Sequence, residues 1–93
     1  MPVGLVTLEI HIPYARSLKD KRQVLRSLKD RLRGHFNVAV AELDHQDKWQ
    51  RSVVGVVGIS GEDGHLAKTM ADVLEASEQV LGGGLISHEI EYL

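Results

Sequence analysis

Hydrophobic and polar residues alternate along residues 3–12. The apolar side chains that share one parity are Val6, Leu8, Ile10 and Ile12. This period of two predicts a strand with one buried face, and Pro13 ends it. Ser17 then occupies the position of a helix N-cap. Asp20, three residues later, fits the capping-box position near the positive end of the helix.

The apolar period becomes helical after this cap. Apolar residues recur at positions 18, 25, 28 and 32, which predicts an amphipathic helix over residues 18–33. Gly34 is expected to end the helix, because glycine is the residue most often found just beyond a helix C-terminus.

The rest of the chain supplies two strands, a second helix and a last strand. Residues 36–43 and 52–60 are rich in small and β-branched side chains, and the polar residues 44–48 are expected to join them as a hairpin. A second helix is predicted over about residues 64–81, before three consecutive glycines. Residues 85–92 alternate again and predict the last strand.

The predicted order of elements is β-α-β-β-α-β, which favours one α+β domain over residues 1–93. Two right-handed βαβ units joined by a hairpin give a ferredoxin-like sandwich, a four-stranded antiparallel sheet with both helices on one face. In that topology the strands lie in the spatial order fourth, first, third, second. The second and fourth strands are then edges, and the other sheet face is uncovered in a monomer.

Composition limits the classes of protein that remain. The chain is 43% hydrophobic and 26% charged, as in ordinary globular proteins, and no apolar run approaches the roughly 20 residues of a membrane span. Cysteine is absent, which excludes disulfides, thiolate chemistry and cysteine zinc sites. The chain begins without the positive segment of a signal peptide. We therefore expect a cytoplasmic protein without a membrane partner.

Lysine and arginine are strongly segregated along the chain. Eight of the eleven lie within residues 16–33 beside two acidic residues, which gives this segment a formal charge of +6 although the whole chain carries −2. Such a segment creates a local positive field that favours polyanions. On a helical projection, one side of the predicted helix carries an uninterrupted basic row. This basic stripe consists of Lys19, Arg22, Arg26, Lys29 and Arg33.

The basic stripe is roughly 20 Å long and could meet several phosphates of one nucleic-acid strand. Lys21 lies close to it, and Arg16 precedes the helix. The predicted nucleic-acid-binding residues are therefore Arg16, Lys19, Lys21, Arg22, Arg26, Lys29 and Arg33. The alternative is a merely solvated helix face, but glutamates at i, i+4 spacing, typical of such faces, are missing. Base stacking on the sheet is not expected, because the third strand has no aromatic residue.

Two further features suggest interaction surfaces. Trp49 comes just after the hairpin link, where it either caps the end of the core or anchors a partner. Arg51, two residues later, would belong to the same partner-binding surface. The second and third predicted strands are apolar at both parities, while Glu9, Glu89 and Glu91 share the outward parity of their strands. An uncovered apolar strip on a small protein favours association, and we expect a homodimer formed by sheet-face packing or edge pairing.

No constellation of catalytic residues is visible. The five histidines form no i, i+4 pair on a helix and have no cysteine or clustered carboxylates beside them, so a metal site is not predicted. Gly58, Gly61 and Gly64 lie between a strand and a helix, but Glu62 and Asp63 would repel a phosphate there. We expect neither an enzyme nor a cofactor.

Three strings along the chain are more specific than its composition. They are Ser17-Leu18-Lys19-Asp20-Lys21-Arg22, Phe36-Asn37-Val38-Ala39-Val40-Ala41-Glu42, and Asp47-Lys48-Trp49-Gln50 with Gly55 following. Together they resemble the YlxP-like family of small bacterial proteins of unknown function. The resemblance spans essentially the whole chain and implies the ferredoxin-like fold. It also implies a bacterial cytoplasmic protein whose genes tend to lie among those for translation and ribosome maturation. It carries over no catalytic residues.

The sequence leaves three functional hypotheses. The first is a non-enzymatic protein that binds RNA or a ribosomal subunit through the basic helix, by shape and backbone rather than by base sequence. The second is a dimeric regulatory module that binds a small ligand at its interface, resembling amino-acid-binding domains of the same fold. The third is a partner of an acidic protein.

Overall fold

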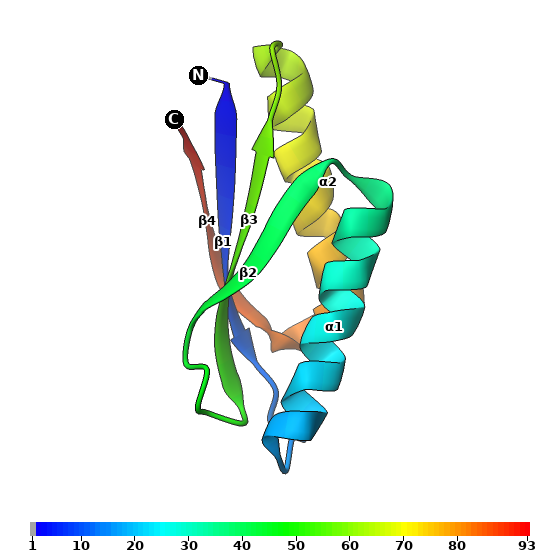
Figure 1. Ribbon diagram of the computed structural model, residues 1–93, viewed down its shortest axis with the longest axis vertical. Helices are drawn as coiled ribbons and strands as arrows, with labels where there is room; N and C mark the ends of the chain where they lie inside the picture. The colour runs from blue at the N-terminus through cyan, green and yellow to red at the C-terminus, as the bar shows by residue number, and fades with distance from the viewer. Residues whose placement is uncertain (1) are drawn as a thin grey trace.

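The computed structural model describes residues 2–93 and confirms the predicted order of elements (Figure 1). The elements are β1 (Val3–His11), α1 (Leu18–His35), β2 (Val38–Asp44), β3 (Arg51–Ile59), α2 (Asp63–Leu81) and β4 (Leu85–Tyr92). A 3₁₀ turn over Gly82–Gly84 separates α2 from β4.

All pairings in the sheet are antiparallel, and the strand order is β2-β3-β1-β4. This is the predicted order, with β2 and β4 at the edges. Both helices lie against the same face of the sheet, and the opposite face is open (Figure 1). The β2–β3 hairpin and the start of α1 lie at one end of the molecule, away from both chain termini (Figure 1).

The hydrophobic core lies between the sheet and the two helices. The predicted inward parity of β1 is confirmed, because Val6, Leu8 and Ile10 are completely buried. Residues Leu25, Leu28 and Leu32 of α1 and Leu66, Met70 and Val73 of α2 cover them. The alternation of β1 and the helical period of α1 therefore point their apolar sides into one shared core.

The two ends of α1 test the predicted capping signals. Ser17 is the N-cap, and its Oγ accepts a hydrogen bond of 3.1 Å from the backbone N–H of Asp20. The prediction that Gly34 ends the helix is wrong, because α1 continues to His35. Phe36 provides the stop: its N–H donates to the Leu32 carbonyl, and its side chain packs against the core. Gly34 does not have the positive φ that a terminating glycine needs.

Candidate functional site

The basic stripe lies on the side of α1 that faces away from α2. On the opposite side of the helix, Arg31 Nη2 donates to Gln79 Oε1 of α2 at 2.8 Å. Arg33, a member of the stripe, instead donates through Nη2 to the Val40 carbonyl of β2 at 3.3 Å. The stripe therefore runs beside the edge strand β2, where no other element of the fold covers it.

The stripe is accessible, and its charges are not neutralised within the molecule. Lys19, Arg22, Arg26 and Arg33 are exposed, while Lys29 is half-buried. Within residues 2–93, none of these five side chains has a carboxylate within ion-pairing distance. Arg16 is also exposed, and only its backbone N–H is engaged, by Asp20 Oδ2 at 2.9 Å. The positive charges are thus accessible to an anion from outside the molecule.

Lys21 does not join this exposed surface. It is 1% exposed, and its Nζ forms an ion pair of 2.7 Å with Glu42 Oε2. The same Nζ donates to the carbonyls of His45 and Lys48, the latter at 2.7 Å. The expectation that Lys21 adds to the nucleic-acid-binding surface must be corrected. Its position, three residues after Leu18 and four before Leu25, places it on the buried side of α1 rather than on the stripe.

We call this buried arrangement the Lys21 clamp. It consists of Lys21, Glu42, Ser52 and the carbonyls of His45 and Lys48. Glu42 Oε2 also accepts a hydrogen bond of 2.7 Å from Ser52 Oγ, which is itself buried. An ammonium group has three donors, and here each has its own oxygen acceptor. The clamp therefore fastens the β2–β3 hairpin to the first half of α1 without leaving a buried donor unpaired.

A second set of hydrogen bonds fastens the hairpin to the loop between β1 and α1. Gln50 Nε2 donates to the carbonyls of Pro13 at 3.0 Å and Ala15 at 3.2 Å. The Gln50 carbonyl in turn accepts from the backbone N–H of Ile12 at 2.8 Å. The hairpin is thus held from two sides, and its conformation includes a positive φ of 63° at His45.

Trp49 projects from this fixed hairpin and is 52% exposed. It does not belong to the core cluster or to the partly buried side chains packed against it, which contradicts the interpretation of Trp49 as a core cap. It lines a shallow hollow of about 400 Å³ together with Asp47, Lys48, Gln50 and Arg51. Arg51 Nη2 is paired with Glu9 Oε1 at 3.2 Å, at the border of the open sheet face.

The open sheet face has an apolar part and an acidic part. The apolar part lies over β2 and β3, where Leu43, Val57 and Ile59 are 52%, 37% and 67% exposed. The acidic part follows β4: Glu89 and Glu91 are paired in register with Thr7 and Leu5 of β1, and so lie on this face. The predicted outward parity of these glutamates is confirmed.

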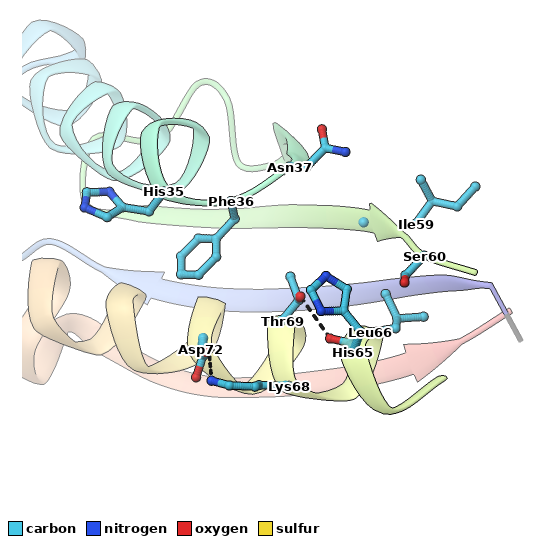
Figure 2. A pocket seen from close by; sticks show the side chains of 11 residues that line it. His35, Phe36, Asn37, Ile59, Ser60, His65, Leu66, Lys68, Thr69 and Asp72 are labelled. Carbon is cyan, nitrogen blue, oxygen red and sulfur yellow. Dashed lines mark hydrogen bonds and ion pairs between the residues drawn. The ribbon is translucent and has the colours of Figure 1, made fainter. Parts of the chain in front are cut away.

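A separate cleft of about 360 Å³ lies between the end of α1, the end of β3 and the first half of α2 (Figure 2). The Phe36 ring points into it toward α2, and His35 and His65 lie on different elements at its border (Figure 2). The lysine among its lining residues already has a partner, because Lys68 Nζ donates to Asp72 Oδ2 at 2.7 Å. This hydrogen bond raises the pKa of Lys68. The cleft lies on the helix side of the sheet and borders the open sheet face only at Ile59, near the end of β3.

The histidines and acids do not assemble into a metal site in the part of the chain that the structure describes. Residues 2–93 contain no group of three or more His, Asp or Glu side chains able to hold a metal ion. His11 and His88 belong to paired strands, but His88 is in register with the inward-facing Leu8, so the two point to opposite sheet faces. No helix among these residues is both long and apolar enough to cross a membrane.

The Lys21 clamp was not among the features predicted from the sequence, although the sequence contains a signal for it. Lys21 falls in the apolar row of α1, where a lysine must find partners when the helix packs. The clamp also joins the three strings that resemble a known family. It takes Lys21 from the first string, Glu42 from the second, and the carbonyl of Lys48 from the third.

These features define the chain as a ferredoxin-like α+β domain with a basic helix side, a clamped hairpin and an open sheet face. The chain belongs to the family described as "Protein of unknown function (DUF503)", whose model matches residues 3–90. It is 36% identical over 72 residues to the uncharacterized protein YlxP of Bacillus subtilis. The aligned segment covers 77% of this chain and 78% of that protein. The resemblance to the YlxP-like family is thereby confirmed.

Solved structures similar to this chain share its fold at low sequence identity. A variant of SnoaB, a cofactor-independent oxygenase from Streptomyces nogalater, has a TM-score of 0.63 at 10% identity, over 100% of this chain and 94% of that one. A dimeric ferredoxin-like protein of unknown function from Thermobifida fusca has a TM-score of 0.50 at 14% identity, over 98% and 90%. These likenesses confirm the ferredoxin-like fold and carry no activity over to this chain.

Proposed function

We propose that this protein is a non-enzymatic RNA-binding protein that holds the phosphate backbone along the basic stripe of α1. The observation that carries the proposal is the row of exposed cations without carboxylate partners beside the edge of β2. Basic side chains that repel one another along a helix cost stability, and an external polyanion removes that cost. Backbone contacts of this kind recognise charge and shape rather than base sequence.

The geometry sets the scale of the interaction. From Lys19 to Arg33 the stripe extends about 21 Å along the helix axis. If its five cations each neutralise one phosphate, the logarithm of the binding constant falls with the logarithm of salt concentration with a slope of about −3.5 to −4.5. Lys21 is not counted among these cations because its charge is already paired with that of Glu42.

The test is binding of purified protein to ribosomal RNA and to isolated ribosomal subunits over a salt series. Ribosomal RNA is the first choice because the family resemblance points toward genes of translation. Arg22→Glu with Arg26→Glu reverses two charges of the stripe. Arg31→Glu with Lys68→Glu is the matched control, because it changes the net charge equally on the α2 side of the molecule.

We expect the stripe variant to lose binding at moderate salt and to flatten the salt slope by roughly 1.5 or more. The control variant should retain a slope close to that of the wild type. No binding by the wild type at low salt, or equal losses in both variants, would refute the proposal. Binding to an acidic protein but to no RNA would assign the stripe to that third class of partner instead.

We also propose that a second copy of this chain covers the apolar part of the open sheet face. Leu43, Val57 and Ile59 are exposed there without a partner within the chain's own fold. Glu89 and Glu91 lie along the β4 edge, so a two-fold axis that is parallel to the strands and passes through the apolar part keeps the two β4 edges apart. A solved protein of the same fold is described as dimeric, which is consistent with this arrangement.

The oligomeric state in solution tests the dimer. We expect the wild type to sediment as a dimer, and Leu43→Asp with Ile59→Asp to sediment as a folded monomer. Tyr14→Asp is the matched control, because Tyr14 is 69% exposed and lies in the loop between β1 and α1, outside the sheet. A monomeric wild type at high micromolar concentration would overturn the arrangement without affecting the RNA proposal.

A further inference from the structure

We infer that the clamped β2–β3 hairpin is a base-stacking site, in which Trp49 stacks on an unpaired base of the RNA strand that the stripe holds. This inference rests on the proposed function and specifies its ligand as RNA with single-stranded character. Trp49 is the one tryptophan of the chain, and more than half of its surface is exposed to solvent. Burying an exposed indole ring is favourable because it removes a large apolar surface from water, and a base stacked on the ring would bury that surface.

Trp49 and the stripe both lie on the β2 side of the molecule. Arg33 of the stripe donates to the Val40 carbonyl of β2, and β2 leads directly into the hairpin that carries Trp49. Lys21 Nζ, on the buried side of α1, lies 2.7 Å from the carbonyl of Lys48, the residue directly before Trp49. The hairpin is thus fastened at the end of the molecule where α1 and its stripe begin (Figure 1). An RNA strand held along the stripe can therefore extend to the hairpin and place a base on Trp49.

The hairpin offers a fixed stacking platform rather than a set of hydrogen-bonding groups for base edges. The polar side chains next to Trp49 are already engaged, Gln50 by Pro13 and Ala15, and Arg51 by Glu9. Only Lys48 and Asp47 of the hollow have no such partner among the described residues. Stacking on an aromatic ring tolerates any base, because every base has a π face. The site should therefore select unpaired over paired RNA and discriminate little among bases.

The Lys21 clamp gives this platform its rigidity. A stacking residue on a mobile loop loses conformational entropy when it binds, and that loss offsets part of the stacking gain. Here the carbonyls on both sides of the hairpin, at His45 and Lys48, are bound to the same ammonium group. The open sheet face offers no alternative, because neither β1 nor β3 has an aromatic residue.

The experiment compares three polyanionic probes at one salt concentration. They are a single-stranded oligouridylate of about 12 nucleotides, an RNA duplex of the same strand length, and inorganic polyphosphate, which has no bases. Because Trp49 is the sole tryptophan, its fluorescence reports the stacking directly. We expect the oligouridylate to quench Trp49, and polyphosphate to bind while leaving the emission nearly unchanged. The duplex should bind with weak quenching.

Variants then separate stacking from charge. Trp49→Ala should weaken oligouridylate binding, measured with labelled RNA, by about 10- to 100-fold while leaving polyphosphate binding within twofold. Trp49→Phe should restore most of the lost affinity. Tyr14→Ala is the matched control. It removes another exposed aromatic, which lines a different hollow with Val24 and Leu81, and should leave both affinities unchanged.

The outcomes distinguish the two proposals. If polyphosphate and RNA both fail to bind the wild type, the proposed function itself fails. If both bind but Trp49 is not quenched and Trp49→Ala binds RNA as well as the wild type, only the stacking site is refuted. An equal loss of RNA and polyphosphate binding in Trp49→Ala would also overturn it, because that result indicates damage to the charged surface rather than loss of a stacked base.

Discussion

Replacing Lys21 with methionine should destabilise the protein far more than replacing any lysine of the basic stripe. Methionine keeps the length and most of the volume of the side chain but removes the ammonium group. The Glu42 carboxylate then loses its counter-ion, and the carbonyls of His45 and Lys48 lose their donor. Ser52 Oγ still donates to Glu42, so the carboxylate keeps one partner.

The structure allows the size of this effect to be bounded. Breaking a fully buried ion pair costs about 3–5 kcal/mol. The Glu42 side chain is 18% exposed, and water can reach the hairpin carbonyls once it loosens, so we expect a smaller loss of about 2–3 kcal/mol. For a domain of this size that loss lowers the melting temperature by roughly 10–20 °C.

Urea denaturation followed by far-UV circular dichroism measures the loss, and Lys19→Met is the matched control. Lys19 is on the same helix but exposed, so its replacement should change the unfolding free energy by no more than about 0.5 kcal/mol. The double variant Lys21→Met with Glu42→Leu should recover part of the lost stability, because no unpaired carboxylate remains. Equal stability of Lys21→Met and Lys19→Met would refute the clamp as a stabilising element.

Glycine substitutions provide three further predictions, each measured by thermal denaturation. Gly34→Ala should stabilise the protein by about 0.5–1 kcal/mol, since Gly34 is helical and nothing lies within 4 Å of an added Cβ. Gly4→Ala should destabilise it by about 1–3 kcal/mol, because the new Cβ would lie 2.8 Å from Cγ and Sδ of the buried Met70. Gly55→Ala should cost less than about 1 kcal/mol: its Cβ meets Leu43, a flexible and exposed side chain that can move away. A Gly34→Ala variant less stable than the wild type, or equal losses for the other two, would contradict these packing arguments.

The strands and helices could be predicted from the sequence because their signals are local. The alternation in β1 and the apolar row of α1 each require only a few neighbouring residues to be recognised. The prediction failed at the end of α1, where Gly34 resembled a stop signal. The helix continues past it because the N–H of Phe36 can still reach the Leu32 carbonyl while the Phe36 side chain joins the core. That packing contact depends on the sheet and is invisible to a local signal.

The basic stripe could be predicted as a row of charges, but the side of the molecule on which it lies could not. Helical spacing alone places the five residues together, whatever the helix packs against. The hydrogen bonds of Arg31 to α2 and Arg33 to β2 reveal that the row faces the edge of β2. This orientation follows from how the apolar side of α1 docks on the sheet. Whether the stripe binds RNA stays a prediction.

The sequence by itself therefore determined the elements, their order, the sheet topology they allow and the concentration of positive charge in one helix. Helical spacing already places two neighbouring lysines, Lys19 and Lys21, on opposite sides of α1, but only the tertiary structure supplied the partners of Lys21. They carry the same charge two residues apart, but the helix turns by about 200° between them, which places one in solvent and one in the interior. The oxygens that bind Lys21 come from residues 42–48, more than twenty positions along the chain. No local pattern contains them, because folding alone brings them within reach of the ammonium group.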